Sequence, residues 1–216
     1  MKLEVLADAE RLADFAARRI ASILRATDGE AAVALAGGST PRKTYERLAT
    51  MDIPWQRIAL FLGDERFVPL TDPASNFRMV VESLGAGDRD RIQLHAVQTD
   101  LTPEAAAAGY EAMLADFAGR SKLFDLVILG LGADGHTASL FPGSAVLDET
   151  ARLVRPTENG RITLTYAALN SSRHTIFLVS GTEKRAALRR LLTQDTSIPA
   201  GRIQGDITIF ADAAAA

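Results

Sequence analysis

The residues best suited to acid–base chemistry in this chain are Asp134 and His136, which follow directly after a run of apolar residues. Histidine is the side chain best able to exchange a proton near neutral pH, and a neighbouring carboxylate can orient its ring. His136 is therefore a candidate general base, with Asp134 as its orienting partner. The alternative is a loop histidine with one structural hydrogen bond. His95 and His174 lie within or beside predicted strands, and we expect structural roles for them.

The glycines around this histidine have the G-x-G-x-x-G spacing of a dinucleotide-binding turn, at Gly130, Gly132 and Gly135. Such a turn needs a long helix directly after it, because the helix N-terminus holds the pyrophosphate. Here residues 141–143, Phe-Pro-Gly, break any helix within a few residues, and no strand-like run leads into the acids at 148–149. We therefore expect no nicotinamide cofactor, and we expect the glycines to let the backbone turn sharply.

A second glycine turn, ALAGGSTPRKTY at 34–45, joins an apolar run to a predicted helix. Thr40 is the expected N-cap of that helix, which would begin at Pro41 and extend over 41–49. With Gly38 and Ser39, it would present backbone amides and hydroxyls to a phosphate or a carboxylate. The spacing is not that of a Walker A loop, and an ordinary capped turn is the alternative.

A third group of polar residues, Asp64, Glu65 and Arg66, follows another apolar run, so their charges are expected at the same edge of the sheet. An acid can steer a proton or hold sugar hydroxyls, and Arg66 can bind an oxyanion. Arg161 and Lys184, at the start of one predicted strand and shortly after another, would add positive charge around an anion. Solvated surface charges are the alternative.

The elements that must position these residues alternate along the chain. Apolar runs indicate strands, and Asp8 is the expected cap of an amphipathic helix that reaches Leu24. Strand-like segments lie at 31–38, 57–65, 92–97, 124–132, 161–169, 174–181 and 206–211, and further helices are predicted at 41–49, 76–84, 103–119 (the longest) and about 183–192. Continuous apolar strands separated by helices predict an α/β fold, a three-layer sandwich in which helices cover both faces of a mostly parallel sheet.

Composition narrows the class of protein. The 216 residues fit one domain, 1–216, and there are no cysteines to form disulfides or thiolate metal sites. The first residues carry acids where a signal peptide would be apolar, so we expect a cytoplasmic protein. A formal net charge of −3 and the lack of long apolar runs predict neither nucleic-acid nor membrane partners. The sequence leaves the oligomeric state open, and a monomer would be consistent with it.

Three segments together resemble the 6-phosphogluconolactonase family, within the wider group that includes glucosamine-6-phosphate deaminase/isomerase. They are LAGGSTPRKTYERL (35–48), LGDERFVPLTDPASNFRM (62–79) and FDLVILGLGADGHTASLFPGS (124–144), and the similarity covers roughly residues 30–205. The resemblance implies a sugar-phosphate isomerase-like fold. It also implies hydrolysis of 6-phospho-D-glucono-1,5-lactone to 6-phosphogluconate, in the oxidative pentose phosphate pathway, without a metal or an organic cofactor.

The resemblance also assigns roles to residues. It places His136 on the family's proposed general base, with Asp134 just before it, and it places Asp64 and Arg66 on the acid and the arginine of the substrate-side loop. Gly38, Ser39 and Thr40 match the sugar-phosphate turn, and Arg161 and Lys184 match its basic partners. A lactone is an activated ester, so a water deprotonated by His136 is a sufficient nucleophile. Arg66 or backbone N–H groups near Gly132 would stabilise the oxyanion.

Two other functions are alternatives to the lactonase: a deaminase/isomerase and a sugar-phosphate sensor. The deaminase relatives carry Asn-Glu-Pro after the same Asp-Gly-His, and that glutamate assists ring opening; this chain has Leu140, Phe141 and Pro142 instead. The missing acid argues against aldose–ketose chemistry. A non-catalytic sugar-phosphate sensor would need an attached DNA-binding module, and the chain has no basic N-terminal extension to supply one.

Overall fold

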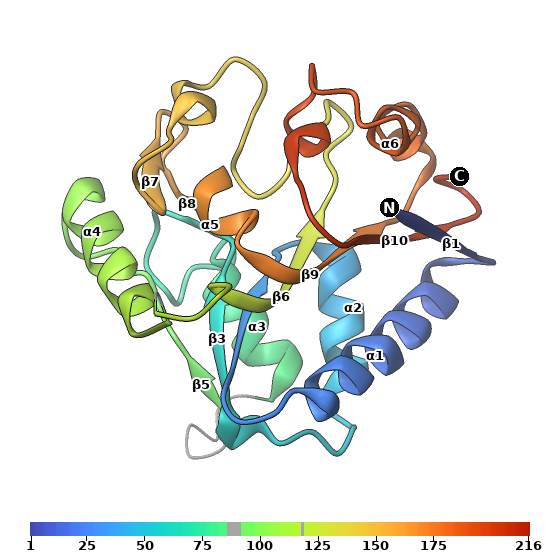
Figure 1. The fold of residues 1–216 in the computed structure, drawn as a ribbon, viewed down its shortest axis with the longest axis horizontal. Helices are drawn as coiled ribbons and strands as arrows, with labels where there is room; N and C mark the ends of the chain where they lie inside the picture. Colours follow the sequence, from blue (N-terminus) through green and yellow to red (C-terminus); the bar gives the residue numbers. More distant parts are fainter. Residues whose placement is uncertain (86–91, 118) are drawn as a thin grey trace.

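The computed structural model of the chain describes residues 1–85, 92–117 and 119–216, and its centre is a seven-stranded sheet (Figure 1). Every neighbouring pair of strands in this sheet is parallel, which confirms the predicted α/β architecture. The strands are, in spatial order, β1 (Lys2–Leu6), β10 (Ile207–Asp212), β9 (Ser172–Val179), β6 (Phe124–Gly130), β2 (Ala31–Leu35), β3 (Ile58–Leu62) and β5 (Gln93–Leu94).

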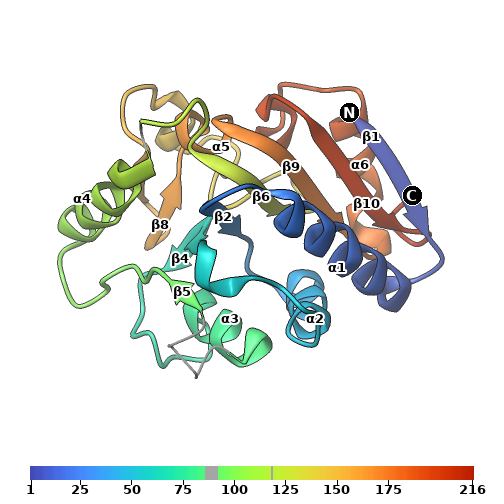
Figure 2. The same cartoon turned by 60° about the horizontal axis from the view of Figure 1, so that its bottom comes forward.

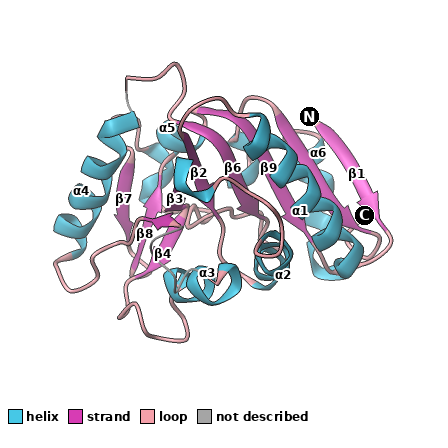
Figure 3. Ribbon diagram, turned by 90° about the horizontal axis from the view of Figure 1, so that it is seen from below, coloured by secondary structure: helices cyan, strands magenta, loops and turns pink. Residues whose placement is uncertain are grey.

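Helices cover both faces of this sheet, as predicted for a three-layer sandwich (Figures 2 and 3). One face carries α1 (Ala9–Ala26), α2 (Ser39–Leu48) and α3 (Asn76–Leu84). The other carries α4 (Pro103–Leu114), α5 (Tyr166–Leu169) and α6 (Arg185–Leu192). Short 3-10 turns are η1 (Trp55–Arg57), η2 (Ala115–Phe117), η3 (Ala145–Asp148), η4 (Thr182–Lys184) and η5 (Pro199–Arg202). None of the helices in the described ranges is long and apolar enough to cross a membrane.

The first helix forms for the reasons that its sequence predicts. The carboxylate of Asp8 accepts a hydrogen bond from the backbone N–H of Arg11 at 2.8 Å and caps α1. Leu12, Ile20 and Leu24 are buried against the sheet, and each such side chain contributes about 1.5–3 kcal/mol relative to an exposed one. With 18 residues, α1 rather than the predicted 103–119 segment is the longest helix.

The predicted helix at 103–119 was too long. Its α-helical part, α4, ends at Leu114, and the chain tightens into the 3-10 turn η2. That turn brings Phe117 into the core, where its ring and that of Phe61 form a T-shaped pair with 5.6 Å between centroids. Residue 118 of the predicted span lies outside the described residues.

The predicted strand at 57–65 is two strands in two sheets. Gly63 ends β3: its N–H donates to the carbonyl of Leu35 in the main sheet, and its own carbonyl accepts from Leu164. The chain then enters a small antiparallel sheet made of β4 (Asp64–Arg66), β8 (Arg161–Leu164) and β7 (Val154–Thr157). The segment predicted as strand at 161–169 likewise divides into β8 and the short helix α5.

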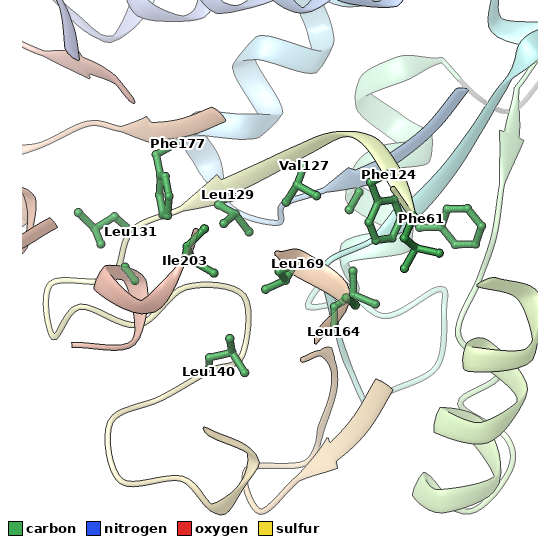
Figure 4. Packing of buried hydrophobic residues seen from close by; sticks show 14 of the residues in the cluster. Phe61, Phe124, Val127, Leu129, Leu131, Leu140, Leu164, Leu169, Phe177 and Ile203 are labelled. Carbon is green, nitrogen blue, oxygen red and sulfur yellow. The ribbon is translucent and has the colours of Figure 1, made fainter. Parts of the chain in front are cut away.

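The apolar core between the main sheet and the helices α4, α5 and α6 supports the loops that follow the strands (Figure 4). Leu129 and Phe177, from β6 and β9, lie across from Ile203 and from Leu140, which comes from the loop after β6. Leu140 and Phe177 are completely buried. The loop that carries His136 is therefore anchored by its own apolar side chains.

Candidate active site

A cleft opens at the carboxyl ends of β2 and β6, two neighbouring strands from which the chain proceeds in opposite directions across the sheet. Parallel α/β sheets bind ligands at such a switch point. The cavity volume is about 230 Å³, smaller than the ~300–1,000 Å³ typical of sites for drug-sized ligands, so it suits a small molecule. The cleft is lined by eight predicted site residues: Gly38, Ser39, Thr40, Asp64, Arg66, His136, Arg161 and Lys184. Asp134, the ninth, contacts His136.

The helix at one end of the cleft, α2, begins earlier than predicted. Gly38 is its N-cap and Ser39 its first residue, so Thr40 and Pro41 lie inside the first turn. Gly38 has a φ of 105°, a conformation that favours glycine, and it has no side chain with which to cap the helix. The backbone amides of Ser39 and Thr40 therefore stand at an uncapped helix N-terminus beside the cleft, which favours an anion.

A close contact fixes the turn before that helix. A Cβ at Gly37 would lie 2.0 Å from the side-chain oxygen of Asn76, so the two segments fit only because residue 37 is glycine. Asn76 in turn donates its side-chain N–H to the carbonyl of Asp64 at 2.8 Å. Asn76 lines the cleft but was not among the predicted site residues, although it lies within the second matching segment, 62–79.

The cleft carries more positive than negative charge. Arg66, Arg161 and Lys184 line it from β4, β8 and η4, while Asp64 is its lining carboxylate. The Arg66 guanidinium donates to the carbonyl of Ala74, and the Nζ of Lys184 lies 3.9 Å from the Glu183 carboxylate. Three cations around one carboxylate favour an anionic ligand.

Asp64 is buried, and its carboxylate forms a hydrogen bond and an ion pair within the protein. One oxygen accepts from the hydroxyl of Ser139 at 2.5 Å and lies 3.5 Å from the guanidinium of Arg161. Asp64 thereby joins the loop after β6 to the small antiparallel sheet. Ser139 is completely buried and was not singled out from the sequence.

The neighbouring acid, Glu65, has a structural position. Its side chain is fully buried and accepts hydrogen bonds from the backbone N–H groups of Arg66, Asn76 and Phe77 and from the hydroxyl of Ser75. Burial raises the pKa of this carboxyl, although the four hydrogen bonds act in the opposite direction. Glu65 thus accepts the first two N–H groups of α3, whose N-cap is Ser75, and closes the loop between Arg66 and Asn76.

His136 and Asp134 form a hydrogen-bonded pair. The Nδ1 of His136 lies 2.6 Å from Asp134 Oδ1, and the same oxygen accepts the backbone N–H of His136 at 3.1 Å. Partial burial works to raise the pKa of Asp134, but these hydrogen bonds outweigh it and hold the pKa below its usual value. Because Nδ1 is committed to Asp134, Nε2 is the ring nitrogen left for a ligand in the cleft.

The glycine spacing around this pair is explained by packing. A Cβ at Gly132 would lie 2.1 Å from His136 Nδ1, and one at Gly135, whose φ is 86°, would lie 2.6 Å from Ile198. No helix follows directly; Thr137 and Leu140 form an isolated bridge instead. The G-x-G-x-x-G pattern therefore makes room for the histidine and for Ile198, and the prediction of no dinucleotide-binding helix at this point is confirmed.

The chain is similar to known proteins over most of its length. Residues 7–210 match the family of glucosamine-6-phosphate isomerases/6-phosphogluconolactonase. The chain is 39% identical to a 6-phosphogluconolactonase of Nostoc over 87% of this chain and 84% of that one, and 41% identical to one of Thermotoga maritima over 80% and 79%. The crystal structure of a 6-phosphogluconolactonase from Shewanella baltica superposes with a TM-score of 0.89 at 30% identity, covering 99% of this chain and 98% of that chain.

Proposed function

Because the chain belongs to the glucosamine-6-phosphate isomerase/6-phosphogluconolactonase family, we propose that the cleft hydrolyses 6-phospho-D-glucono-1,5-lactone to 6-phosphogluconate, with His136 as the general base. The chain is an enzyme of the 6-phosphogluconolactonase type, a hydrolase of the oxidative pentose phosphate pathway. The single observation that carries the mechanism is that the turns containing Gly38, Asp64 and His136 line one cleft.

The phosphate of the substrate binds at the α2 end of the cleft in this proposal. The uncapped amides of Ser39 and Thr40 supply backbone donors, and Lys184, whose side chain is 26% exposed, supplies a charge that is not fully neutralised by its distant contact with Glu183. The phosphate is remote from the bond that breaks, so its binding energy serves to hold the lactone ring in position.

At the other end of the cleft, Nε2 of His136 removes a proton from a water molecule as the water oxygen attacks the lactone carbonyl carbon. The carbonyl π electrons move to oxygen and form a tetrahedral oxyanion. When the carbonyl re-forms, the ring C–O bond breaks and the leaving oxygen takes the proton back from the imidazolium. The Asp134 carboxylate holds the imidazole in the tautomer that has Nε2 free, and it stabilises the imidazolium.

The structure narrows the choice of oxyanion donor. The N–H of Gly132 already donates to the carbonyl of His136 at 2.8 Å, and the N–H of Gly135 donates to Gly132. Arg66 is the stronger candidate, because the residue lines the cleft and carries a permanent positive charge, whereas these two glycine N–H groups already have acceptors. A well-placed donor to an oxyanion lowers the activation free energy by ~3 kcal/mol.

The deaminase alternative has no support at the position where its relatives carry a glutamate. Leu140 is completely buried in the core, and the Phe141 ring packs on the imidazole of His136 with 4.3 Å between centroids. Neither residue offers a carboxylate for proton transfer during isomerisation. The lactonase proposal needs no group there.

We also propose that the enzyme acts in the cytoplasm on a small sugar phosphate, without nucleic-acid or membrane partners. A phosphorylated substrate does not cross a lipid bilayer readily, so the enzyme must work where the lactone is made. The cations described above gather in the cleft, while the formal net charge of the whole chain is −3.

The test is a comparison of two histidine variants in hydrolysis assays corrected for spontaneous opening of the lactone. His136→Ala is expected to lose most of kcat and to keep its affinity for 6-phosphogluconate. His174→Ala is the matched control: His174 also pairs with an aspartate, Asp206, at 2.8 Å, but it lies at the other end of β9. Wild-type kcat in the His136 variant would overturn the base assignment, and tight binding without any turnover by the wild-type protein would indicate a sensor.

A further inference from the structure

The first strand is an exposed sheet edge with an apolar face. β1 forms one end of the main sheet and, in the ranges that the structure describes, pairs with β10 alone (Figure 2). Met1, Leu3 and Val5 share one face and are 44%, 36% and 51% exposed; they are three of the five large apolar side chains that are exposed among the described residues. An unpaired apolar edge is a template for another strand.

The backbone groups on this edge have a defined direction. The carbonyl of Leu6 accepts a hydrogen bond from Ala213, the residue that follows β10, so Leu6 turns its peptide groups toward β10. Successive residues of a strand turn their N–H and C=O groups to opposite sides. The N–H and C=O groups of Leu3 and Val5 therefore point outward, away from the sheet.

The sequence of β1 is complementary to itself in one antiparallel register. We propose that β1 pairs with β1 of a second copy of this chain, about a twofold axis at Leu3. Leu3 then lies opposite its own copy, Lys2 lies opposite Glu4, and Met1 lies opposite Val5. The outward groups of Leu3 form the hydrogen-bonded pair at the centre. A shift by two residues either way places Glu4 opposite Glu4 or Lys2 opposite Lys2, which is unfavourable.

The two faces of β1 suit this pairing. Leu3 lies beside Ile209 and Val5 beside Ala211 in β10, and both neighbours belong to the core that α6 covers. The apolar row of one copy would continue into that of the other on this face, and the Lys2–Glu4 pairs would lie on the opposite face. The interface is isologous, as expected for a twofold dimer, and joins the two sheets into one of 14 strands, seven from each copy.

The pairing is expected to be weak and independent of catalysis. One strand pair buries less surface than the ~1,200–2,000 Å² of a stable interface, so a reversible dimer is expected rather than a permanent one. Two strands, β10 and β9, separate β1 from β6, which leads into the His136 loop. Lactone hydrolysis therefore serves as a readout of correct folding in every variant.

Sedimentation of the full chain tests the proposal. The average mass is expected to rise above the 23.1 kDa of one copy as the concentration increases to about 1 mM. Lys2→Glu or Glu4→Lys replaces two favourable pairs by two like-charge pairs, so each variant is expected to weaken dimerisation by about tenfold. An equimolar mixture of the two variants pairs Glu with Lys at both positions and is expected to regain the dimer. Arg18→Glu, on the exposed face of α1, is the control with the same charge change as Lys2→Glu.

Three results would overturn the proposal. The first is a wild-type chain that stays at the mass of one copy up to about 1 mM. The second is that Lys2→Glu leaves dimerisation unchanged, or that Arg18→Glu weakens dimerisation as much as Lys2→Glu does. The third is failure of the mixed variants to associate, which would exclude the register centred on Leu3.

Discussion

Gly132→Ala tests whether the position of the imidazole controls the rate. The added Cβ would lie 2.1 Å from Nδ1 and 2.4 Å from Cε1 of His136, and 2.5 Å from Oδ1 of Asp134. The φ of Gly132 is not among the positive values in this chain, so an alanine there is not strained by its backbone. The substitution therefore acts on the His136–Asp134 pair rather than on the fold of the turn.

The size of the effect follows from these contacts. Ordinary van der Waals contact for a Cβ begins near 3.4 Å, so the ring must retreat by about 1 Å from its present position. A misplacement of about 1 Å in a catalytic group costs about 100-fold in rate, which is ~2.7 kcal/mol in activation free energy. The phosphate end of the cleft is unchanged, so the affinity for 6-phosphogluconate is expected to change by less than about threefold.

The assay measures kcat by proton release and measures product binding separately by calorimetry. Gly109→Ala is the matched control, because a Cβ at this exposed position in α4 meets nothing within 4 Å. Alanine is a better helix former than glycine by about 0.5–1 kcal/mol, so this control is expected to be slightly more stable and fully active. If Gly132→Ala is folded, binds the product and keeps kcat within about threefold of wild type, the reasoning from imidazole position to rate is wrong.

Three further outcomes are expected. Asp134→Asn keeps the shape of the side chain but loses the charge that orients His136, and kcat is expected to fall by at least about 100-fold in the lactonase assay. Lys184→Ala is expected to raise KM for the phosphorylated lactone by about tenfold and to leave hydrolysis of unphosphorylated gluconolactone unchanged, since its charge serves the phosphate. The lowered pKa of Asp134 adds a small stability above the carboxyl's unfolded pKa and loses it as the pH falls through the folded value. Thermal unfolding of wild type and Asp134→Ala should accordingly differ at pH 7, and the difference should shrink as the pH falls through the lowered pKa of the folded Asp134 carboxyl.

The parallel sheet and its covering helices were predictable because each depends on local patterns. The buried strands are continuous apolar runs, and α3 has the predicted bounds, 76–84, because Ser75 caps its start and Gly85 adopts the left-handed conformation at its end. β1 was missed because its exposed edge position leaves no continuous apolar run, although its alternation of charged and apolar residues is the pattern of a half-exposed strand. The predicted strand at 92–97 shrank to the two residues of β5.

The start of α2 was misplaced because the pattern of Thr40 and Pro41 obeys the usual capping preferences. The structure instead starts the helix at Ser39, where the positive φ of Gly38 turns the chain and Asn76 packs on Gly37. That contact joins residues far apart in the sequence, so no local rule contains it. The placement of Ser39 at the cleft was predicted correctly, while the geometry of its amide was not.

The charged residues show most clearly where sequence reasoning stops. Asp64, Glu65 and Asp134 are all acids that follow apolar strands, yet they differ in their partners. Glu65 accepts from four donors, Asp64 contacts Ser139, Asn76 and Arg161, and Asp134 accepts from His136. Asp212 belongs to the same group, since it is buried and accepts from Ser180 and from the N–H of Gly181, holding the turn that leads to Lys184.

The two ends of the cleft are thus held by carboxylates that do no chemistry in the proposed reaction. Glu65 fixes the segment from Arg66 to Asn76, and Asp212 fixes the turn before Lys184. A buried carboxylate loses its hydration and is stable only when donors replace it, so each of these acids defines the positions of several backbone N–H groups. The cations proposed to bind the substrate can then be long side chains on the short elements β4, β8 and η4, because buried acids that take no part in the proposed reaction fix the neighbouring backbone.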